Sequence, residues 1–402
     1  MPCSNQRDCC LDLILRQSKY PVHKLRCTFS EHLWNSATNQ HASIWNIVLL
    51  YSPSVGGMAS TRGSGLSTLM YGTTAENVVT LKVVTPDGKL VQTRRRVRKS
   101  STGYEMTQLY VGSEGTLGII VELTLKLWTI PKVRCGAFVR FESLHDAATA
   151  TIALVHASLP TLCRCELLNS EGVKATNKKF GTNLKPSPTI FLEYRGDSLD
   201  ICKSEAARGQ AVMEANEAKA YTFAGKGSEL DKLWEARRGC YLASISYDDR
   251  KGNKVFISDT CVPISNVAQM ISETEDDFTK KKFPCIICAH IADGNFHCCV
   301  PYQPDRQMDV LELENRMIER ALRYDGTVSG EHGVGVGKIG HIIAEHGEDH
   351  INLQRAVKRA LDPRNIMNPG KIFILPRHEG GCCDVPHEYH QTEAYSGGTY
   401  EH

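Results

Sequence analysis

A short segment from His290 to His297, with the sequence H-I-A-D-G-N-F-H, limits most strongly how this chain can fold. Apolar residues lie on both sides of an Asp293-Gly294 pair, which is typical of a two-residue β-hairpin turn because glycine tolerates a positive φ angle. Counting outward from this turn pairs residue 290 with residue 297. The two histidines are therefore predicted to face each other on one side of a sheet, with Cβ atoms about 5 Å apart.

Two imidazoles on one sheet face can bind a single metal ion, and a catalytic metal usually takes a third protein ligand. A second segment, S-G-E-H-G-V-G-V-G-K at 329–338, offers Glu331 as that ligand. Gly330 and Gly333 flank it, so the backbone can approach a site without steric conflict at Cβ. We interpret the adjacent His332 as an unligated, neutral imidazole that can accept a proton. The alternative is that these side chains are hydrogen-bonded core residues.

The composition and charge of the chain exclude several classes of function. Its 402 residues are 41% hydrophobic and 23% charged, which is typical of a soluble protein with two or three domains. A net charge of +2 favours no charged partner, and the basic cluster at 94–99 is expected in a solvated loop. No apolar run approaches the roughly 18 residues of a membrane-spanning helix. Neither nucleic acid nor a transmembrane segment is therefore expected.

The cysteines indicate a reducing compartment. There are 16 of them, and they are scattered or adjacent in pairs rather than arranged as a disulfide framework. Cys285 and Cys288 have the spacing of a zinc ribbon, but the sequence has no second C-x-x-C pair to complete one. We expect both to be buried strand residues.

The order of predicted elements indicates an α+β fold with an antiparallel sheet. A hairpin is expected around the turn at 86–88, and the alternating apolar residues of 119–127 predict a strand. Ser143 with Asp146 resembles a capping box for the helix that follows. The glycines at 56–72 could cradle an anion with main-chain N–H groups or simply form turns. The other predicted elements are helices at about 145–157, 201–218, 265 onward, 308–324 and 349–361, and a strand at 189–194.

Nine short motifs in chain order resemble those of the FAD-linked 2-hydroxy-acid dehydrogenases, a branch of the vanillyl-alcohol-oxidase-like flavoproteins. They are V-G-G-M-A-S-T, Y-G-T-T-A-E-N-V, V-T-P-D-G, G-S-E-G-T-L-G-I-I, L-W-E-A-R, C-V-P-I-S, H-I-A-D-G-N-F-H, S-G-E-H-G-V-G-V-G-K and N-I-M-N-P-G-K. The likeness covers about 55–376. One such motif would be weak evidence, whereas nine in register are specific.

The resemblance implies an α+β fold built from an incomplete FAD-binding domain of the PCMH type and a cap domain. The cap domain is expected to be α+β with an antiparallel sheet, and the flavin to lie between the two. The expected segments are an unmatched N-terminal stretch at 1–54, the remaining half of the FAD-binding domain at 55–130, the cap or substrate domain with the metal site at 131–335, a C-terminal helix and turn returning to the flavin at 336–376, and a disordered tail at 377–402.

The resemblance also implies roles for individual residues. It makes His290, His297 and Glu331 the metal ligands, and two imidazoles with one carboxylate suit zinc, manganese or iron. It makes His332 the base that removes the substrate hydroxyl proton, and Arg237 the residue that binds the substrate carboxylate. The residues expected to line FAD are Gly56, Gly57, Gly65, Gly112, Glu114, Gly115, Ile119 and Asn368.

The activity implied by the resemblance is oxidation of a D-2-hydroxy acid, with D-lactate as the expected substrate and pyruvate as the product. A hydride would pass to FAD and the hydroxyl proton to His332, and electrons would continue to cytochrome c or another carrier. The family relationship implies a mitochondrial location. The chemistry agrees with the residue pattern, because a 2-hydroxy acid can chelate one divalent ion through its carboxylate and hydroxyl.

Residues 1–54 contain no counterpart of the glycine-rich loop with which this family holds the FAD pyrophosphate. We therefore expect a shortened isoform or a faulty gene model of an active family. Two alternatives to the dehydrogenase follow. One is a catalytically inactive truncated product that cannot hold FAD, and the other is a flavin-free metal enzyme with a His/His/Glu site.

Overall fold

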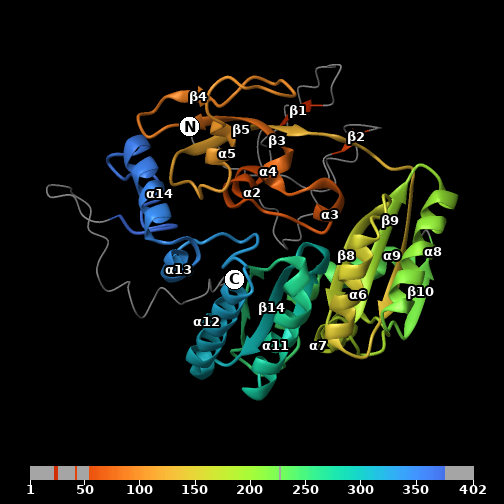
Figure 1. Ribbon diagram of the computed structural model, residues 1–402. Coiled ribbons are helices and arrows are strands. Elements are labelled where there is room, and N and C mark those ends of the chain that lie inside the picture. The colour runs from red at the N-terminus through yellow and green to blue at the C-terminus, as the bar shows by residue number, and fades with distance from the viewer. Residues whose placement is uncertain (1–21, 26–40, 43–53, 226–227, 376–402) are drawn as a thin grey trace, which may run out of the picture.

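Two antiparallel sheets organise the chain in a computed structural model that describes residues 22–25, 41–42, 54–225 and 228–375 (Figure 1). The smaller sheet has the strand order β1-β5-β3-β4, and β2 pairs separately with β6. The elements of this part of the chain are β1 (Val22–Leu25), β2 (His41–Ala42), α2 (Val55–Thr61), α3 (Thr68–Tyr71), α4 (Thr74–Asn77), β3 (Val78–Val84), β4 (Leu90–Gln92), α5 (Met106–Tyr110), β5 (Ile119–Lys126) and β6 (Trp128–Thr129).

The larger sheet has the order β10-β7-β9-β8-β13-β14-β11, with β12 paired to β14. Its strands are β7 (Val133–Arg140), β8 (Leu162–Leu168), β9 (Thr189–Gly196), β10 (Ala220–Ala224), β11 (Lys254–Ile257), β12 (Thr260–Cys261), β13 (Ile286–His290) and β14 (Asn295–Tyr302). The helices are α6 (Leu144–His156), α7 (Ser170–Phe180), α8 (Leu199–Ala215), α9 (Ser228–Arg238), α10 (Cys240–Ile245), α11 (Val267–Lys280), α12 (Gln307–Arg323), α13 (Ile342–His346) and α14 (Glu348–Leu361).

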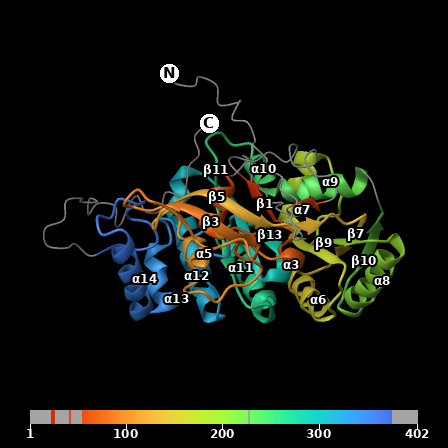
Figure 2. The same cartoon turned by 90° about the horizontal axis from the view of Figure 1, so that it is seen from above.

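Helices cover both faces of the larger sheet, as the view from above shows (Figure 2). Helices α6, α8, α11 and α12 pack on one face, and α7, α9 and α10 pack on the other. Strands β8, β13 and β14 are consequently buried along their whole length. Cys285 and Cys288 are buried free thiols, as expected, and Cys288 lies in β13, whereas Cys285 directly precedes that strand.

Most of the local predictions are confirmed. The turn at 86–88 joins β3 to β4, where Val84 pairs with Leu90 and Gly88 has a φ of 81°. Helix α6 begins after Ser143, whose hydroxyl accepts a hydrogen bond from the amide of Asp146 at 3.0 Å. The basic cluster at 94–99 lies in a largely exposed loop after β4. The segment 377–402 and most of 1–54 lie outside the described residues.

Strand β5 forms where the alternating pattern predicted it, but only half of its apolar face is buried. Leu123 and Leu125 are almost inaccessible to solvent, whereas Ile119 and Val121 are 55% and 45% exposed. The buried half packs against α2 and α5 in the core of the smaller sheet. The alternation therefore identified the strand correctly and overestimated how much of it is covered.

The predicted register of the central hairpin is wrong by two residues. His290 pairs with Asn295, and His297 lies opposite Cys288. A 3-10 turn at 291–293 follows β13 and lengthens the connection beyond two residues, so Gly294 ends the turn with a φ of 77°. Because side chains alternate with a period of two, an even shift leaves both histidines on the same sheet face.

The C-terminal segment returns to the smaller sheet. Helix α14 packs there through Val357 and Leu361. Lys358 is buried and donates hydrogen bonds to the Thr116 carbonyl and to the Asp362 carboxylate. Among the helices of the described ranges, none combines the length and the apolar character needed to cross a bilayer.

Candidate active site

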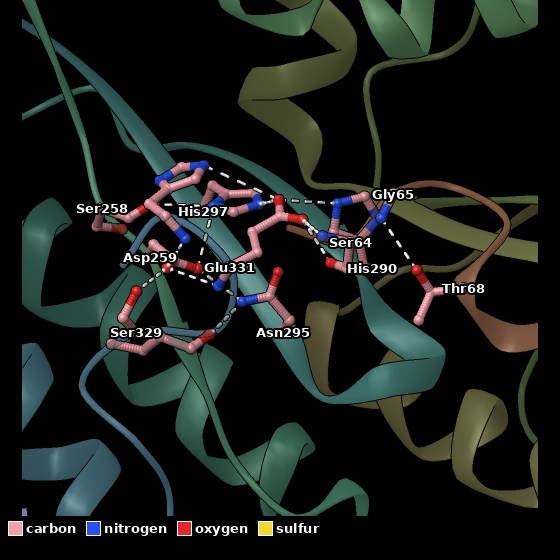
Figure 3. A network of polar contacts seen from close by, with 12 residues as sticks. Ser64, Gly65, Thr68, Ser258, Asp259, His290, Asn295, His297, Ser329 and Glu331 are labelled. Atoms are coloured by element: carbon pink, nitrogen blue, oxygen red, sulfur yellow. Dashed lines mark hydrogen bonds and ion pairs between the residues drawn. The ribbon is translucent and has the colours of Figure 1, made fainter. Parts of the chain in front are cut away.

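His290, His297 and Glu331 converge at the end of the larger sheet that faces the smaller one (Figures 1 and 3). The two histidines come from β13 and β14, and Glu331 comes from the loop after α12. Glu331 Oε1 lies 3.4 Å from Nε2 of His290 and 3.0 Å from Nε2 of His297. The structure thus brings together the three residues that the sequence predicted to act jointly, with one ligand atom from each within 4.8 Å of the others.

These separations fit a site for one divalent metal. Bonds of about 2.1 Å at angles between 90° and 109° place neighbouring ligand atoms about 3.0 to 3.4 Å apart. The two distances from Glu331 Oε1 match this spacing. Two imidazole nitrogens and one carboxylate oxygen can serve zinc, manganese or iron, so the residues fit the group without identifying it.

The other nitrogen of each imidazole is held by the protein. His297 Nδ1 lies 3.0 Å from the carbonyl oxygen of Ser258, and His290 Nδ1 lies 2.9 Å from Glu166 Oε1. Both partners are hydrogen-bond acceptors, so each Nδ1 donates a proton to the protein, and each Nε2 is the nitrogen that a metal would bind in place of a proton. The sheet therefore orients both rings with Nε2 toward the ligand group, as metal binding requires.

Asp259 holds the loop that carries Glu331 and His332. Its Oδ2 accepts hydrogen bonds from the Ser329 hydroxyl at 2.6 Å and from the amides of Glu331 at 3.0 Å and His332 at 2.9 Å (Figure 3). Its Oδ1 accepts a fourth from the Asn295 side chain at 2.8 Å. Asp259 is fully buried, so one carboxylate fixes the positions of a predicted ligand and a predicted base.

The two glycines of this loop are required for close approach, as the sequence suggested. A Cβ on Gly330 would lie 2.0 Å from Nδ2 of Asn295. A Cβ on Gly333 would lie 2.6 Å from Glu114 Oε1, and Gly333 also has a φ of 83°. Side chains at either position would displace the loop from the partners that hold it.

The substitution Asp259→Asn is expected to lower the free energy of unfolding by about 2 to 3 kcal/mol. The amide would place an NH2 group against either the Asn295 side-chain donor or the donors of the loop, and it would remove the negative charge that strengthens the remaining bonds. Urea denaturation of the full chain measures the change. Asp249→Asn is the control, because Asp249 is an exposed partner of Lys178 and its substitution should cost less than about 1 kcal/mol. Equal losses in the two variants would contradict the role of Asp259.

The second carboxylate oxygen of Glu331 is held by the smaller-sheet part of the chain. Glu331 Oε2 accepts hydrogen bonds from the Ser64 hydroxyl and, at 3.3 Å, from the Ser64 amide. Ser64 lies in the glycine-bracketed loop at 63–65 that the sequence singled out as a turn or an anion cradle. In the structure this loop binds a carboxylate of the protein itself, and so connects the two sheets at the site.

The carboxylate of Glu331 and the imidazoles of His290 and His297 shift the pKa values of one another. Burial alone would lower the pKa of His290, but Glu166 and Glu331 outweigh it and raise the pKa well above its usual value. Burial likewise opposes the protonation of His297, yet the hydrogen bond and charge of Glu331 raise its pKa to about 9. Burial would raise the pKa of Glu331, but the two histidines lower it well below its usual value. The site therefore favours an ionised carboxylate next to a positive charge.

His332 lies beside this group and, with Asp259 and His297, forms a second set of ligand atoms within 4.8 Å of one another. Its ring stacks on that of His297, with centroids 4.8 Å apart and planes 14° from parallel. His332 Nε2 is 3.9 Å from Glu331 Oε1, and 43% of the side chain remains exposed. Burial of the remainder lowers its pKa and keeps the imidazole neutral. A neutral, partly accessible imidazole beside the ligand group is suited to accept a proton.

Arg237 is connected to the ligand group through Glu166, whose other oxygen contacts His290. It comes from α9, is fully buried, and donates from Nη2 to Glu166 Oε2 at 2.5 Å. Burial would lower its pKa, but the Glu166 carboxylate raises it. Among the described residues, Arg237 Nε has no hydrogen-bond partner. The guanidinium therefore donates a hydrogen bond to Glu166 from Nη2, while Nε is left without an acceptor among the described residues.

Several residues expected to line FAD are brought together at the edge of the smaller sheet. The amide of Gly112 donates to the Ala59 carbonyl at 2.9 Å, which fixes the turn at 112–115 against α2. Asn368 Nδ2 donates to the Glu114 carbonyl at 2.5 Å, so the C-terminal turn reaches this segment. Gly115 lies beside Asn368, since a Cβ on that glycine would be 3.9 Å from it.

The other residues expected to line FAD lie in different elements of the smaller-sheet part of the chain. Gly56 and Gly57 lie in the first turn of α2, and Gly65 follows Ser64 in the loop before α3. Ile119 begins β5 and is half-exposed. The Glu114 side chain has a different use: its two oxygens accept hydrogen bonds from the amides of Val334 at 2.7 Å and Gly335 at 2.8 Å.

Sequence reasoning missed Asp259, Glu166 and Ser64 as parts of the site. Asp259 and Ser64 gave no local signal, because their partners lie far away in the chain. Glu166 did offer one. It is a charged residue in the otherwise largely apolar strand at 162–168, and a charged group on a buried strand requires a specific partner.

The fold is shared with solved structures of low sequence identity. The structure resembles 4-ethylphenol oxidase from Gulosibacter chungangensis with a TM-score of 0.70 and 14% identity, over 91% of this chain and 79% of that one. It resembles an alkyldihydroxyacetonephosphate synthase with a TM-score of 0.65 and 17% identity, over 89% and 66%. These likenesses confirm the predicted α+β fold with antiparallel sheets.

The chain belongs to the family of FAD-linked oxidases. The family model for the FAD-linked oxidase C-terminal domain matches residues 130–372, and the model for an FAD-binding domain matches residues 35–94. The resemblance found in the nine sequence motifs is thereby confirmed. FAD is accordingly the cofactor that the domains of this family bind.

Two curated relatives of the chain are named as D-lactate dehydrogenases. It is 37% identical over 328 residues to the mitochondrial D-lactate dehydrogenase [cytochrome] of Arabidopsis thaliana, which covers 81% of this chain and 57% of that protein. It is 37% identical over 325 residues to the probable mitochondrial D-lactate dehydrogenase of Danio rerio, covering 79% and 65%. This chain thus spans less than two thirds of the length of these relatives.

Proposed function

We propose that this chain carries the catalytic site of an FAD- and metal-dependent dehydrogenase of D-2-hydroxy acids, with D-lactate as substrate and pyruvate as product. The convergence of His290, His297 and Glu331, with a neutral His332 beside them, is the observation that carries the proposal. The names of the relatives support the substrate, and they also support electron transfer to cytochrome c or another carrier and a mitochondrial location.

In this proposal each residue of the site has a separate chemical role. His290, His297 and Glu331 would hold one divalent metal and leave positions open for the substrate carboxylate and α-hydroxyl. When bound, the metal would lower the pKa of that hydroxyl and FAD would accept the hydride from the α-carbon. His332 would take the hydroxyl proton at its exposed edge, since its ring stacks on His297 and is neutral.

Arg237 would bind the substrate carboxylate and so orient the α-hydrogen. The structure limits how it can do so, because Nη2 already donates to Glu166. We propose that the nitrogens not used by Glu166 make this contact. The buried, unpartnered Nε is in keeping with a guanidinium that has donor capacity left for a ligand.

The purified chain is expected to be yellow and to lose its 450 nm absorbance on anaerobic addition of D-lactate. Absorbance spectroscopy checks this result, with L-lactate as the control that should leave the spectrum unchanged. Elemental analysis of the same sample is expected to show one divalent metal. Colourless protein that retains a metal would favour a flavin-free His/His/Glu enzyme. Colourless, metal-free protein would favour a product without catalysis.

A further inference from the structure

We propose that Glu166 is a positioning residue of the metal centre, which holds His290 in its metal-binding tautomer while its other oxygen holds Arg237. This role rests on the proposed function of His290 as a metal ligand. It goes further by connecting that ligand to the predicted substrate-binding arginine through one buried carboxylate.

Strand pairing places Glu166 at this position. Strand β8 runs antiparallel to β13, with Leu168 opposite Cys288 and Leu167 opposite Ala289. The same register continued by one residue sets Glu166 beside His290. Its side chain therefore points to the sheet face on which His290 lies, and Glu166 Oε1 is 2.9 Å from His290 Nδ1.

Because these contacts are buried, the loss of either one is expected to cost more free energy than the loss of an exposed contact. Glu166, His290 and Arg237 are 2%, 6% and 3% exposed, so water cannot replace a lost partner. Glu166 Oε2 accepts from Arg237 Nη2 at 2.5 Å, which balances the charge of the carboxylate. Removing one member of such a buried pair leaves the other charge without compensation.

Both partners of Glu166 need to donate, and this requirement selects a carboxylate. The guanidinium of Arg237 can only donate, and His290 must donate from Nδ1 if its Nε2 is to bind a metal. A glutamine would offer one acceptor and one donor. If its NH2 faced His290, the ring proton would have to move to Nε2 and block the metal-binding atom. If its NH2 faced Arg237, two donors would meet.

Glu193 provides a matched comparison on the neighbouring strand β9. It is as deeply buried as Glu166 and also pairs with arginines, with Oε1 2.5 Å from Nε of Arg195 and Oε2 3.5 Å from Nη1 of Arg164. Among the described residues, the ion-pair partners of Glu193 are arginines and not metal-ligand candidates. A general effect of removing a buried carboxylate should therefore appear equally at Glu193 and at Glu166.

The test is a titration of the full chain with Co²⁺ alone, followed through its visible d–d absorption. Glu166→Gln is expected to weaken Co²⁺ binding by about 10- to 100-fold, as loss of a supporting hydrogen bond to a metal ligand does, and to change the shape of the band. Glu193→Gln is expected to keep the wild-type affinity and spectrum. Circular dichroism establishes that each variant is folded.

Glu166→Asp keeps the charge but shortens the side chain by one methylene, and serves if Glu166→Gln does not fold. It is expected to weaken Co²⁺ binding several-fold. Wild-type affinity in a folded Glu166 variant would overturn the role of Glu166 and leave the proposed metal site intact. Equal weakening in Glu193→Gln would also overturn it. Absence of Co²⁺ binding by the wild-type chain would overturn both this role and the metal site itself.

Discussion

His297→Ala is expected to abolish metal binding by this chain. The imidazole supplies one of only three proposed protein ligands, and its Nε2 lies 3.0 Å from the oxygen that Glu331 contributes. Two remaining ligands cannot complete a site of the kind that enzymes use for divalent metals. The loss should therefore exceed the roughly 100-fold cost of removing a supporting hydrogen bond. Elemental analysis of dialysed protein, compared with the wild type, measures it.

His346→Ala is the matched control for this prediction. His346, at the end of α13, stacks on His350 of α14 with ring centroids 4.6 Å apart. It should keep the wild-type metal content, because neither ring belongs to a ligand group of the described chain. Full metal content in His297→Ala would show that His297 is not a ligand.

His332→Ala is expected to reduce flavin bleaching by D-lactate about 10²- to 10⁴-fold, the range over which a general base contributes. The metal content should stay close to wild type, since His332 Nε2 lies 3.9 Å from Glu331 Oε1, whereas the two ligand histidines approach more closely. Anaerobic stopped-flow absorbance at 450 nm measures the rate in a single turnover.

Comparing His332→Ala with His297→Ala distinguishes the proposed general base from the proposed metal ligand. His332→Ala should retain metal and lose the rate, and His297→Ala should lose metal and rate together. Equal loss of metal in both would contradict the assigned roles. A wild-type bleaching rate in His332→Ala would assign the proton to another group.

Local signals in the sequence predicted much of the fold. The turn at 86–88, the capped helix after Ser143 and the strand that begins at Ile119 all depend on residues close together in the chain. The register of the central hairpin depends on tertiary contact instead. A Cβ on Gly294 would lie 2.0 Å from the Val262 carbonyl, and no local pattern around 290–297 shows that this neighbour is present.

The residues of the candidate site likewise include some that local sequence motifs predict and others that only tertiary contacts reveal. The three proposed ligands could be predicted because each lies in a short glycine-containing motif that concentrates metal-binding side chains. Ser64, Glu166 and Asp259 could not, because they act across sequence separations of 267, 124 and 72 residues. Their roles follow from strand pairing and from the contact between the two sheets, which only the folded chain supplies.

The most direct test of the central claim is a crystal structure of the full chain soaked with Mn²⁺, with anomalous differences measured to locate the ion. The account predicts one strong peak about 2.0 to 2.3 Å from Nε2 of His290, Nε2 of His297 and a carboxylate oxygen of Glu331. A peak bound elsewhere, or no peak at saturating Mn²⁺ with these three side chains in place, would contradict it.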